Sequence, residues 1–280
     1  FNLNYQIVSN CFKNSNVLLM NRRKILGGLL IYLSSTLLTF EAYSWYKRKD
    51  RKEQQDQEEQ QLTEQDRIGI FSRLSSTYDD EVDTLEWLTG TKKERKRLIS
   101  QVSGGQCLEI AAGTGRNLAY FCQQPIESLT LSDLSQPMLD TAKQKYAEMV
   151  INGSIKQLPQ VQFVNADAAQ LPFASNSFDS VVDTFGLCSF EDPSQVLKEV
   201  HRVCRPGGRI ILLEHGESKS FQSIANYQKK HAHAHLKKFG CYWDRNIQQI
   251  VEQHSSLFKL IQHRSIQFGT THAFLLENQN

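Results

Sequence analysis

The chain has 280 residues, of which 40% are hydrophobic and 22% are charged. This length and composition suit one globular domain of about 200 residues with additional segments. The 32 Lys and Arg residues nearly balance the 30 Asp and Glu residues, so the overall charge gives no argument for nucleic-acid binding.

The first 66 residues divide into three segments. Residues 1–24 contain basic but no acidic residues, which is compatible with the end of a mitochondrial presequence. Residues 25–46 carry one charge, and as a helix they would extend about 33 Å, enough to cross the hydrocarbon core of a bilayer. We therefore predict a transmembrane helix, with a targeting segment as the alternative. Residues 47–66 are rich in Lys, Arg, Gln and Glu and predict a polar stalk.

Residues 67–280 are predicted to form the globular domain, and its first part, 67–101, is expected to be helical. Thr91-Lys-Lys-Glu94 is typical of a capping box, which predicts a helix that continues to Ile99. The basic residues of this helix predict a solvated face, with contact to lipid headgroups or RNA as the alternative.

The most informative segment is Cys107-Leu-Glu-Ile-Ala-Ala-Gly-Thr-Gly-Arg-Asn117. It predicts a buried parallel strand over 107–111 that ends in a glycine turn and leads into a helix over 116–123. Such a turn lets the backbone approach a nucleotide-type cofactor closely. The third glycine of the dinucleotide pattern G-x-G-x-x-G is absent in either register, which argues against that class of cofactor.

Two further strands are expected to end in acidic residues. A strand over 128–131 leads to Asp133, placed to accept hydrogen bonds from both hydroxyls of a ribose. The alternative is that this segment only begins the next helix, which Ser135 could cap as well. A strand over 161–165 precedes Asp167, which on its own would more often be a turn residue.

The remaining pattern predicts a sheet that closes with an antiparallel hairpin. We expect strands over 180–184 and 209–214 on either side of a helix over 193–204. The apolar runs 258–266 and 272–276 are joined by so short a link that they must be antiparallel neighbours.

These motifs, in this order, resemble the class I S-adenosylmethionine-dependent methyltransferases. Ala111 stands where the first glycine of their acid-x-G-x-G-x-G motif would be, and Arg205-Pro206-Gly207-Gly208 is also similar to the family. The resemblance implies an α/β, Rossmann-like sheet of seven strands with an antiparallel C-terminal hairpin, preceded here by a single transmembrane helix. Three stretches, 183–193, 214–216 and 240–245, are more similar to membrane-anchored Oms-type proteins of the mitochondrial inner membrane. They are similar, more distantly, to a group of the endoplasmic reticulum and lipid droplets that acts on small alkyl thiols.

The resemblance implies that the chain is an enzyme that binds S-adenosyl-L-methionine and transfers its methyl group to an acceptor. Asp167 would accept from the adenine amino group, and the backbone N–H of Ala168 would reach the ring. The residues expected to bind the cofactor are Glu109, Ala111, Gly113, Gly115, Asp133, Asp167, Ala168 and Thr184.

Methyl transfer needs orientation more than a fixed catalytic residue, because the cofactor supplies the leaving group. His215, after the fifth strand, is the best-placed base if the acceptor needs one, although a structural histidine is the simpler interpretation. The residues expected to wall the acceptor pocket are Leu187, Cys188, Tyr242 and Trp243; for the last two, core packing is an equal alternative.

No metal site is expected. None of the six cysteines has a C-x-x-C spacing, so we predict reduced and mostly buried thiols. His231 and His235 would share a helix face, but no third ligand lies nearby in the sequence.

The acceptor itself is not readable from the sequence: a small lipophilic molecule, an RNA or a protein all remain open. A non-catalytic assembly or scaffold factor that keeps the fold is the competing function. The expected partners are the lipid bilayer through 25–46 and proteins of a mitochondrial membrane. The expected location is the mitochondrial inner membrane, with the endoplasmic reticulum as the alternative.

Overall fold

The computed structural model describes residues 43–47, 62–155 and 160–280. The chain divides into two compact units, residues 1–61 and residues 62–280. In the first unit only 43–47 are described, and they are helical. Most of the predicted span, 25–42, and most of the predicted stalk therefore lie outside the described residues. Among the helices of the described part, none combines the length and the apolar character needed to cross a membrane.

The second unit contains one seven-stranded sheet with the order β3-β2-β1-β4-β5-β7-β6. Only β7 runs antiparallel to its neighbours, β5 and β6; the other pairs are parallel. The predicted seven-stranded sheet with an antiparallel C-terminal hairpin is confirmed. The strands are β1 (Gly105–Ile110), β2 (Ile126–Asp133), β3 (Gln160–Asn165), β4 (Phe178–Thr184), β5 (Cys204–His215), β6 (Phe258–Ile266) and β7 (Thr271–Asn278).

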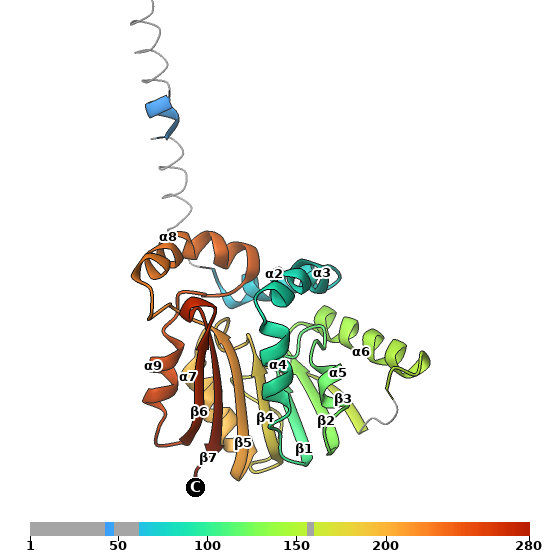
Figure 1. Cartoon of the computed structure of the whole chain (residues 1–280). Coiled ribbons are helices and arrows are strands. Elements are labelled where there is room, and N and C mark those ends of the chain that lie inside the picture. Colours follow the sequence, from blue (N-terminus) through green and yellow to red (C-terminus); the bar gives the residue numbers. More distant parts are fainter. Residues whose placement is uncertain (1–42, 48–61, 156–159) are drawn as a thin grey trace, which may run out of the picture. The chain divides into compact units, whose positions relative to one another are not determined.

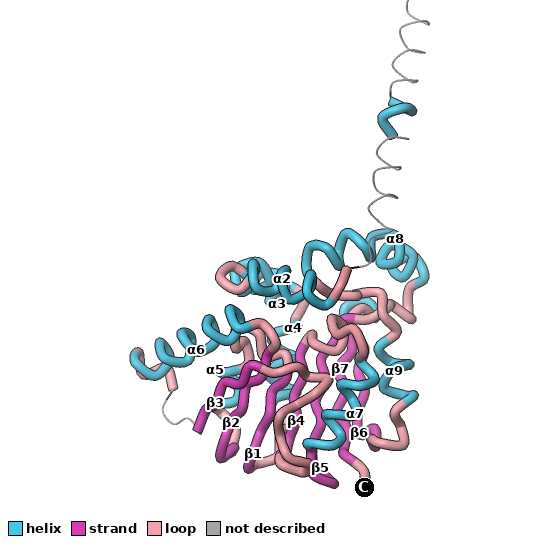
Figure 2. The backbone as a smooth tube through the Cα atoms, turned by 180° about the vertical axis from the view of Figure 1, so that it is seen from behind, coloured by secondary structure: helices cyan, strands magenta, loops and turns pink. Residues whose placement is uncertain are grey.

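Helices cover both faces of the sheet and its carboxyl edge (Figures 1 and 2). One face carries α4 (Thr91–Ile99), α5 (Leu118–Phe121) and α6 (Gln136–Ile151), and the other carries α7 (Pro193–Val203) and α9 (Ile247–Gln253). The helices α2 (Glu64–Leu74), α3 (Tyr78–Leu88) and α8 (Gln222–Phe239) lie over the edge where the parallel strands end. This is the edge at which open α/β sheets bind their ligands.

Each face of the sheet buries its own apolar cluster, because successive strand residues point to opposite faces. On the face of α7, Leu108 and Ile210 pack with Val200. On the face of α4, Cys107 and Ile211 pack with Leu98. The central strands are buried on both sides, which explains their nearly continuous apolar runs.

Four local expectations were wrong. The helix of 91–99 has no capping box: its N-cap is Gly90, with φ 76°, and no side chain caps it. Arg95 is buried rather than on a solvated face. The helix after the glycine turn is the four-residue α5 rather than 116–123. The Arg-Pro-Gly-Gly run lies within β5, where the register with β4 shifts, rather than before it. A true capping box, Thr63 with Asp66, begins α2.

Candidate cofactor site

The glycine turn after β1 is a left-handed backbone segment. Ala111, Gly113 and Gly115 have φ values of 46°, 54° and 71°. Glycine adopts such values at little cost, whereas an L residue is strained there. Gly115 is also required by packing, since a Cβ at this position would lie 2.7 Å from the Leu118 side chain.

Asp133, the last residue of β2, connects this turn to the second strand. One of its carboxylate oxygens accepts a hydrogen bond from the Gly113 N–H at 2.8 Å, and the other accepts from the Ser135 N–H at 2.8 Å. Burial raises the pKa of this carboxyl group, while the backbone N–H groups act in the opposite direction. Ser135 does occupy the N-cap of α6, but its side chain makes no capping hydrogen bond. The helix does begin in this segment, and the Asp133 carboxylate rather than the Ser135 side chain bonds the backbone at its start.

Asp167 follows β3 at the same edge of the sheet. Its carboxylate accepts a hydrogen bond from the Ala169 N–H at 2.8 Å, which fixes the side chain within the turn. Ala168, between them, is buried, while Asp167 is half-buried.

These residues meet around one cavity between the sheet edge and the helices above it. The floor is built by Ala111, Gly113, Asp133, Asp167, Ala168 and Thr184 together with neighbouring residues of the same turns. The roof comes from Arg67, Ile68 and Phe71 of α2 and Tyr78 of α3. Two of the expected cofactor residues, Glu109 and Gly115, are not part of the cavity wall.

The roof is held to the glycine turn by ion pairs. The Arg116 guanidinium reaches three carboxylates of α3, those of Asp79, Asp83 and Glu86, at 3.1, 3.0 and 2.9 Å. Thr114 adds a hydrogen bond to Asp79 at 2.6 Å. The three acids are spaced i, i+4 and i+7, so they lie on one face of the helix. This spacing is a sequence signal that the motif-based prediction did not use.

A buried polar network lies behind the turn. Glu109 is 1% exposed, and one of its oxygens accepts from Asn117 at 2.5 Å while the other has no hydrogen-bond partner among the described residues. Asn117 and Arg95 both donate to the Thr184 hydroxyl, at 3.0 and 2.8 Å. Burial raises the pKa of Glu109 to about 8, so the group is largely protonated at neutral pH. Glu109 thus lies behind the cavity and joins β1 to the segment after the glycine turn through its hydrogen bond with Asn117.

None of the residues expected around the acceptor forms part of the cavity wall. Leu187 and Cys188 are fully buried in the core beside it. The Tyr242 hydroxyl accepts from Arg67 at 3.0 Å, and the Trp243 ring stacks on His235 with centroids 4.1 Å apart. Tyr242 and Trp243 therefore join α2 and α8 to the sheet edge, while the wall facing this side is made by Ser189, Phe185 and Phe190.

His215 also lies outside the cavity wall, with its ring centroid 4.3 Å from that of Phe185. Its neighbours are two cysteines, Cys188 and Cys241. All five cysteines in the described part of the chain are free, and four of them are buried, as expected. On α8, His231 contacts Tyr227, and burial lowers the pKa of His235 to about 4.

Comparison with known proteins relates the domain that contains this sheet to methyltransferases. Residues 108–212 match the family described as a methyltransferase domain. "Methyltransferase OMS1, mitochondrial" of Saccharomyces cerevisiae is 29% identical over 224 residues, which are 75% of this chain and 46% of that protein. "Ubiquinone/menaquinone biosynthesis C-methyltransferase UbiE" of Haemophilus ducreyi is 35% identical over 151 residues, 52% of this chain and 55% of that protein. The chain thus spans about half the length of these curated relatives.

A solved structure shares the fold. The complex between the Haloferax volcanii Trm112 methyltransferase activator and a methyltransferase superposes with a TM-score of 0.59 at 16% identity, over 75% of this chain and 98% of that one. Residues 108–212 carry the family match, and β6 and β7, which follow them in the chain, complete the sheet. Residues 108–212 of the chain therefore match a methyltransferase domain, within a sheet whose fold this solved structure shares.

Proposed function

We propose that the protein is an S-adenosylmethionine-dependent methyltransferase. The observation that carries this proposal is the convergence of Gly113, Asp133 and Asp167 on one cavity at the carboxyl edge of the sheet. The backbone of Gly113, which has no Cβ, lies beside the carboxylates of Asp133 and Asp167. This arrangement suits a ribose and an adenine rather than a phosphate. Bound there, the cofactor would supply an electrophilic methyl group on sulfur.

The residues present fit that cofactor. We propose that Asp133 accepts hydrogen bonds from the ribose hydroxyls with the lone pairs that the Gly113 and Ser135 N–H groups leave free. Asp167 would accept from the adenine amino group, with the Ala168 N–H beside the ring. A Cβ added at Gly113 would project into open space, since its nearest atom would be the Ala111 carbonyl oxygen at 4.0 Å. Glycine at this position leaves that space to the ligand.

The acceptor we propose is a small, uncharged, lipid-soluble molecule rather than an RNA or a protein. The cavity wall includes the aromatic rings of Phe71, Tyr78, Phe185 and Phe190, which suit an apolar ligand. Relatives are named for ubiquinone and menaquinone biosynthesis, which is the same chemical class. Proximity and exclusion of water would then provide most of the rate enhancement.

We further propose that residues 25–46 anchor the protein in a mitochondrial membrane, most simply the inner one. The support is the apolar composition of this segment and the mitochondrial relative. A membrane anchor and a lipid-soluble acceptor would be consistent with each other, since both place the reaction at the bilayer surface.

Cofactor binding tests the proposal directly. The full-length chain in detergent should bind S-adenosylmethionine and S-adenosylhomocysteine in calorimetric titrations. Asp133→Asn should weaken both by about 10- to 100-fold, the effect of losing hydrogen bonds to a charged acceptor. Asp140→Asn, on the exposed part of α6, is the matched control and should bind as the wild type does. The absence of binding by the wild-type chain would contradict the proposal.

The scaffold alternative has one structural observation in its favour, the strained alanine at 111 in the cofactor turn. A Gly113→Arg variant would fill the cavity while leaving distant surfaces unchanged. We expect it to lose both cofactor binding and rescue of a strain that lacks the gene. Full rescue by this variant, with no cofactor bound, would favour a non-catalytic role.

A further inference from the structure

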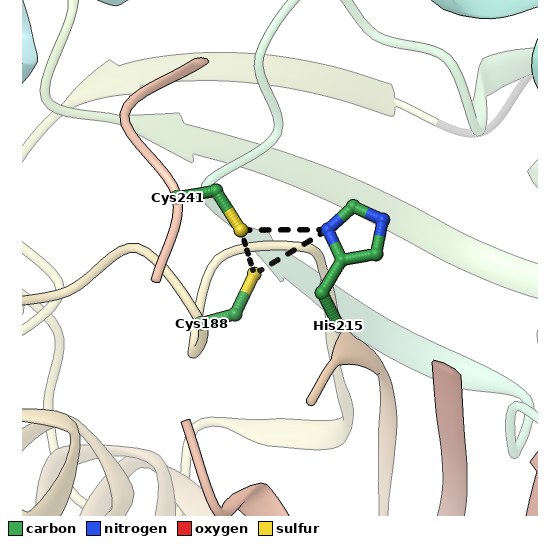
Figure 3. Close-up of side chains that lie close together, drawn as sticks. All are labelled: Cys188, His215 and Cys241. Atoms are coloured by element: carbon green, nitrogen blue, oxygen red, sulfur yellow. Dashed lines mark hydrogen bonds between the residues drawn. The ribbon is translucent and has the colours of Figure 1, made fainter. Parts of the chain in front are cut away.

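Three side chains that can bind a metal converge beside the cofactor cavity (Figure 3). Cys188 lies in the turn after β4, His215 ends β5, and Cys241 follows Gly240, the C-cap of α8. The two Sγ atoms are 3.3 Å apart. His215 Nδ1 lies 3.4 Å from Cys241 Sγ and 4.0 Å from Cys188 Sγ. Figure 3 shows that both sulfurs point toward this nitrogen.

The three ligands are held in place by their backbones. The Tyr242 N–H donates to the Cys188 carbonyl at 2.9 Å, which joins the segment after α8 to the turn after β4. The Cys188 N–H in turn donates to the buried Glu214 carboxyl group at 2.9 Å. Phe185 covers the His215 ring. The cluster therefore does not depend on long, freely rotating side chains.

These separations are those of a tetrahedral site. With zinc–sulfur and zinc–nitrogen bonds of about 2.3 and 2.05 Å, a tetrahedron requires roughly 3.8 Å between two sulfurs and roughly 3.6 Å between sulfur and nitrogen. The three observed distances lie within about 0.5 Å of these values, so only small side-chain shifts would complete the geometry. Two sulfurs and one imidazole nitrogen also suit zinc among the common divalent ions.

We propose that Cys188, His215 and Cys241 bind one zinc ion. The ligands are two thiolates and the Nδ1 atom of a neutral imidazole, whose proton is then on Nε2. Binding releases the two thiol protons to solvent and forms two zinc–sulfur bonds and one zinc–nitrogen bond, with no change in oxidation state. Three protein ligands leave a fourth position for water. The Ser189 hydroxyl lies 3.9 Å from Cys188 Sγ.

The surroundings favour a metal over two reactive thiols. Cys188 and Cys241 are both buried, so a pair of thiolates at this place requires a compensating positive charge. A divalent ion balances the charge of both thiolates, which otherwise could not be buried together. The site would then join α8 to the sheet edge next to Ser189, a residue of the cavity wall.

Metal titration tests the site independently of methyl transfer. The full-length chain is purified under reducing conditions, stripped with a chelator and titrated with Zn²⁺ against a chromophoric competitor, with no cofactor added. We expect one equivalent to bind tightly and to raise the melting temperature. Cys241→Ser and Cys188→Ser should each weaken binding at least about 100-fold. Cobalt substituted for zinc should show thiolate-to-metal charge-transfer absorption, which histidines alone cannot produce.

Two control variants separate this site from others. Cys122→Ser removes a half-buried free thiol elsewhere, and His231→Gln removes a histidine of α8; both should bind zinc as the wild type does. The metal-free Cys241→Ser chain should melt near the metal-free wild type, which shows that it is folded. Equal zinc affinity in the Cys241→Ser chain, no tight equivalent in the wild type, or a Cys188–Cys241 disulfide in the anaerobically purified chain would each overturn the proposal.

Discussion

Ala111 occupies a backbone conformation that favours glycine, at the centre of the cofactor turn. Its φ of 46° places it in the left-handed region, which costs an L residue about 1–2 kcal/mol. The methyl group of Ala111 lies close to Gly186: a Cβ added at Gly186 would be 2.2 Å from Asp183 Oδ1 and 2.7 Å from the Ala111 Cβ. Asp183 and Ala111 therefore both require glycine at position 186.

Ala111→Gly should stabilise the protein. Relief of the left-handed strain outweighs the greater flexibility of glycine in the unfolded chain, for a net gain of about 0.5–1 kcal/mol in the free energy of unfolding. Denaturant unfolding monitored by circular dichroism measures it. The control is Ala112→Gly, at a buried alanine with ordinary negative φ, which should destabilise by a similar amount. Equal losses of free energy of unfolding in both variants would show that the backbone conformation at position 111 does not destabilise the protein.

Glu109 should make stability depend on pH. Its pKa rises from 4.5 to about 8 on folding, because burial disfavours the charged form. The stability that protonated Glu109 contributes is complete below pH 4.5 and is lost as pH rises toward 8, by roughly 1.4 kcal/mol per pH unit within this window. Glu109→Gln cannot ionise, so its melting temperature should fall less than that of the wild type between pH 5 and pH 8. If the melting temperatures of the wild type and Glu109→Gln changed equally with pH, Glu109 would not be the group responsible.

At the scale of elements, α3 is fixed to the glycine turn mainly through Arg116. The guanidinium side chain is 12% exposed, whereas the three carboxylates that it contacts range from 11% to 52% exposed. Removing one partner of such a pair costs more free energy of unfolding than at the surface, because it leaves charges partly buried and unpaired. The contact also holds the part of the cavity roof that α3 supplies through Tyr78.

Arg116→Gln should loosen this roof. We expect a loss of about 2 kcal/mol in the free energy of unfolding, intermediate between exposed and buried ion pairs. Amide hydrogen exchange in Tyr78–Leu88 should accelerate. Lys229→Gln, which removes an exposed lysine paired with Glu217, loses the same charge and should cost less than about 1 kcal/mol. Unchanged exchange in α3 would show that other contacts hold the helix.

The strands were predictable from sequence because their apolar runs end in glycines or acidic residues, which are typical of the turns that follow buried strands. The helix Thr91–Ile99 is present as predicted, but its capping box does not form, for a physical reason. The Thr91 hydroxyl accepts from Gln267, and Glu94 pairs with Arg97 and Arg264. Tertiary contacts thus replaced the local capping pattern. In the same way, nothing local in the sequence joins Cys188, His215 and Cys241. The pairing of β4 with β5 and the contact of the segment after α8 with the turn after β4 bring these distant residues together.

At the scale of the whole molecule, the last strand is an internal one. β7 lies between β5 and β6 and pairs with both over most of its length. Its side chains Ala273 and Phe274 contribute to the two opposite cores. The C-terminal residues therefore hold the two faces of the domain together.

Removing residues 271–280 should abolish cooperative folding. The deletion exposes the edge of β5 and removes buried side chains from both faces, each worth about 2 kcal/mol or more. We expect no cooperative thermal transition and accumulation in the insoluble fraction. The shorter deletion of Gln279 and Asn280 leaves β7 complete and should fold. A soluble, cooperatively melting chain without 271–280 would contradict this view.

The position of β7 also constrains how the protein is made. Because this inner strand follows all the others in the chain, β5 must wait with an open edge until residues 271–278 have been synthesised. During that interval the nascent domain offers a strand to which other chains can add. Chaperones that shield such edges should therefore associate with the protein until residues 271–278 have emerged, and release it soon afterwards.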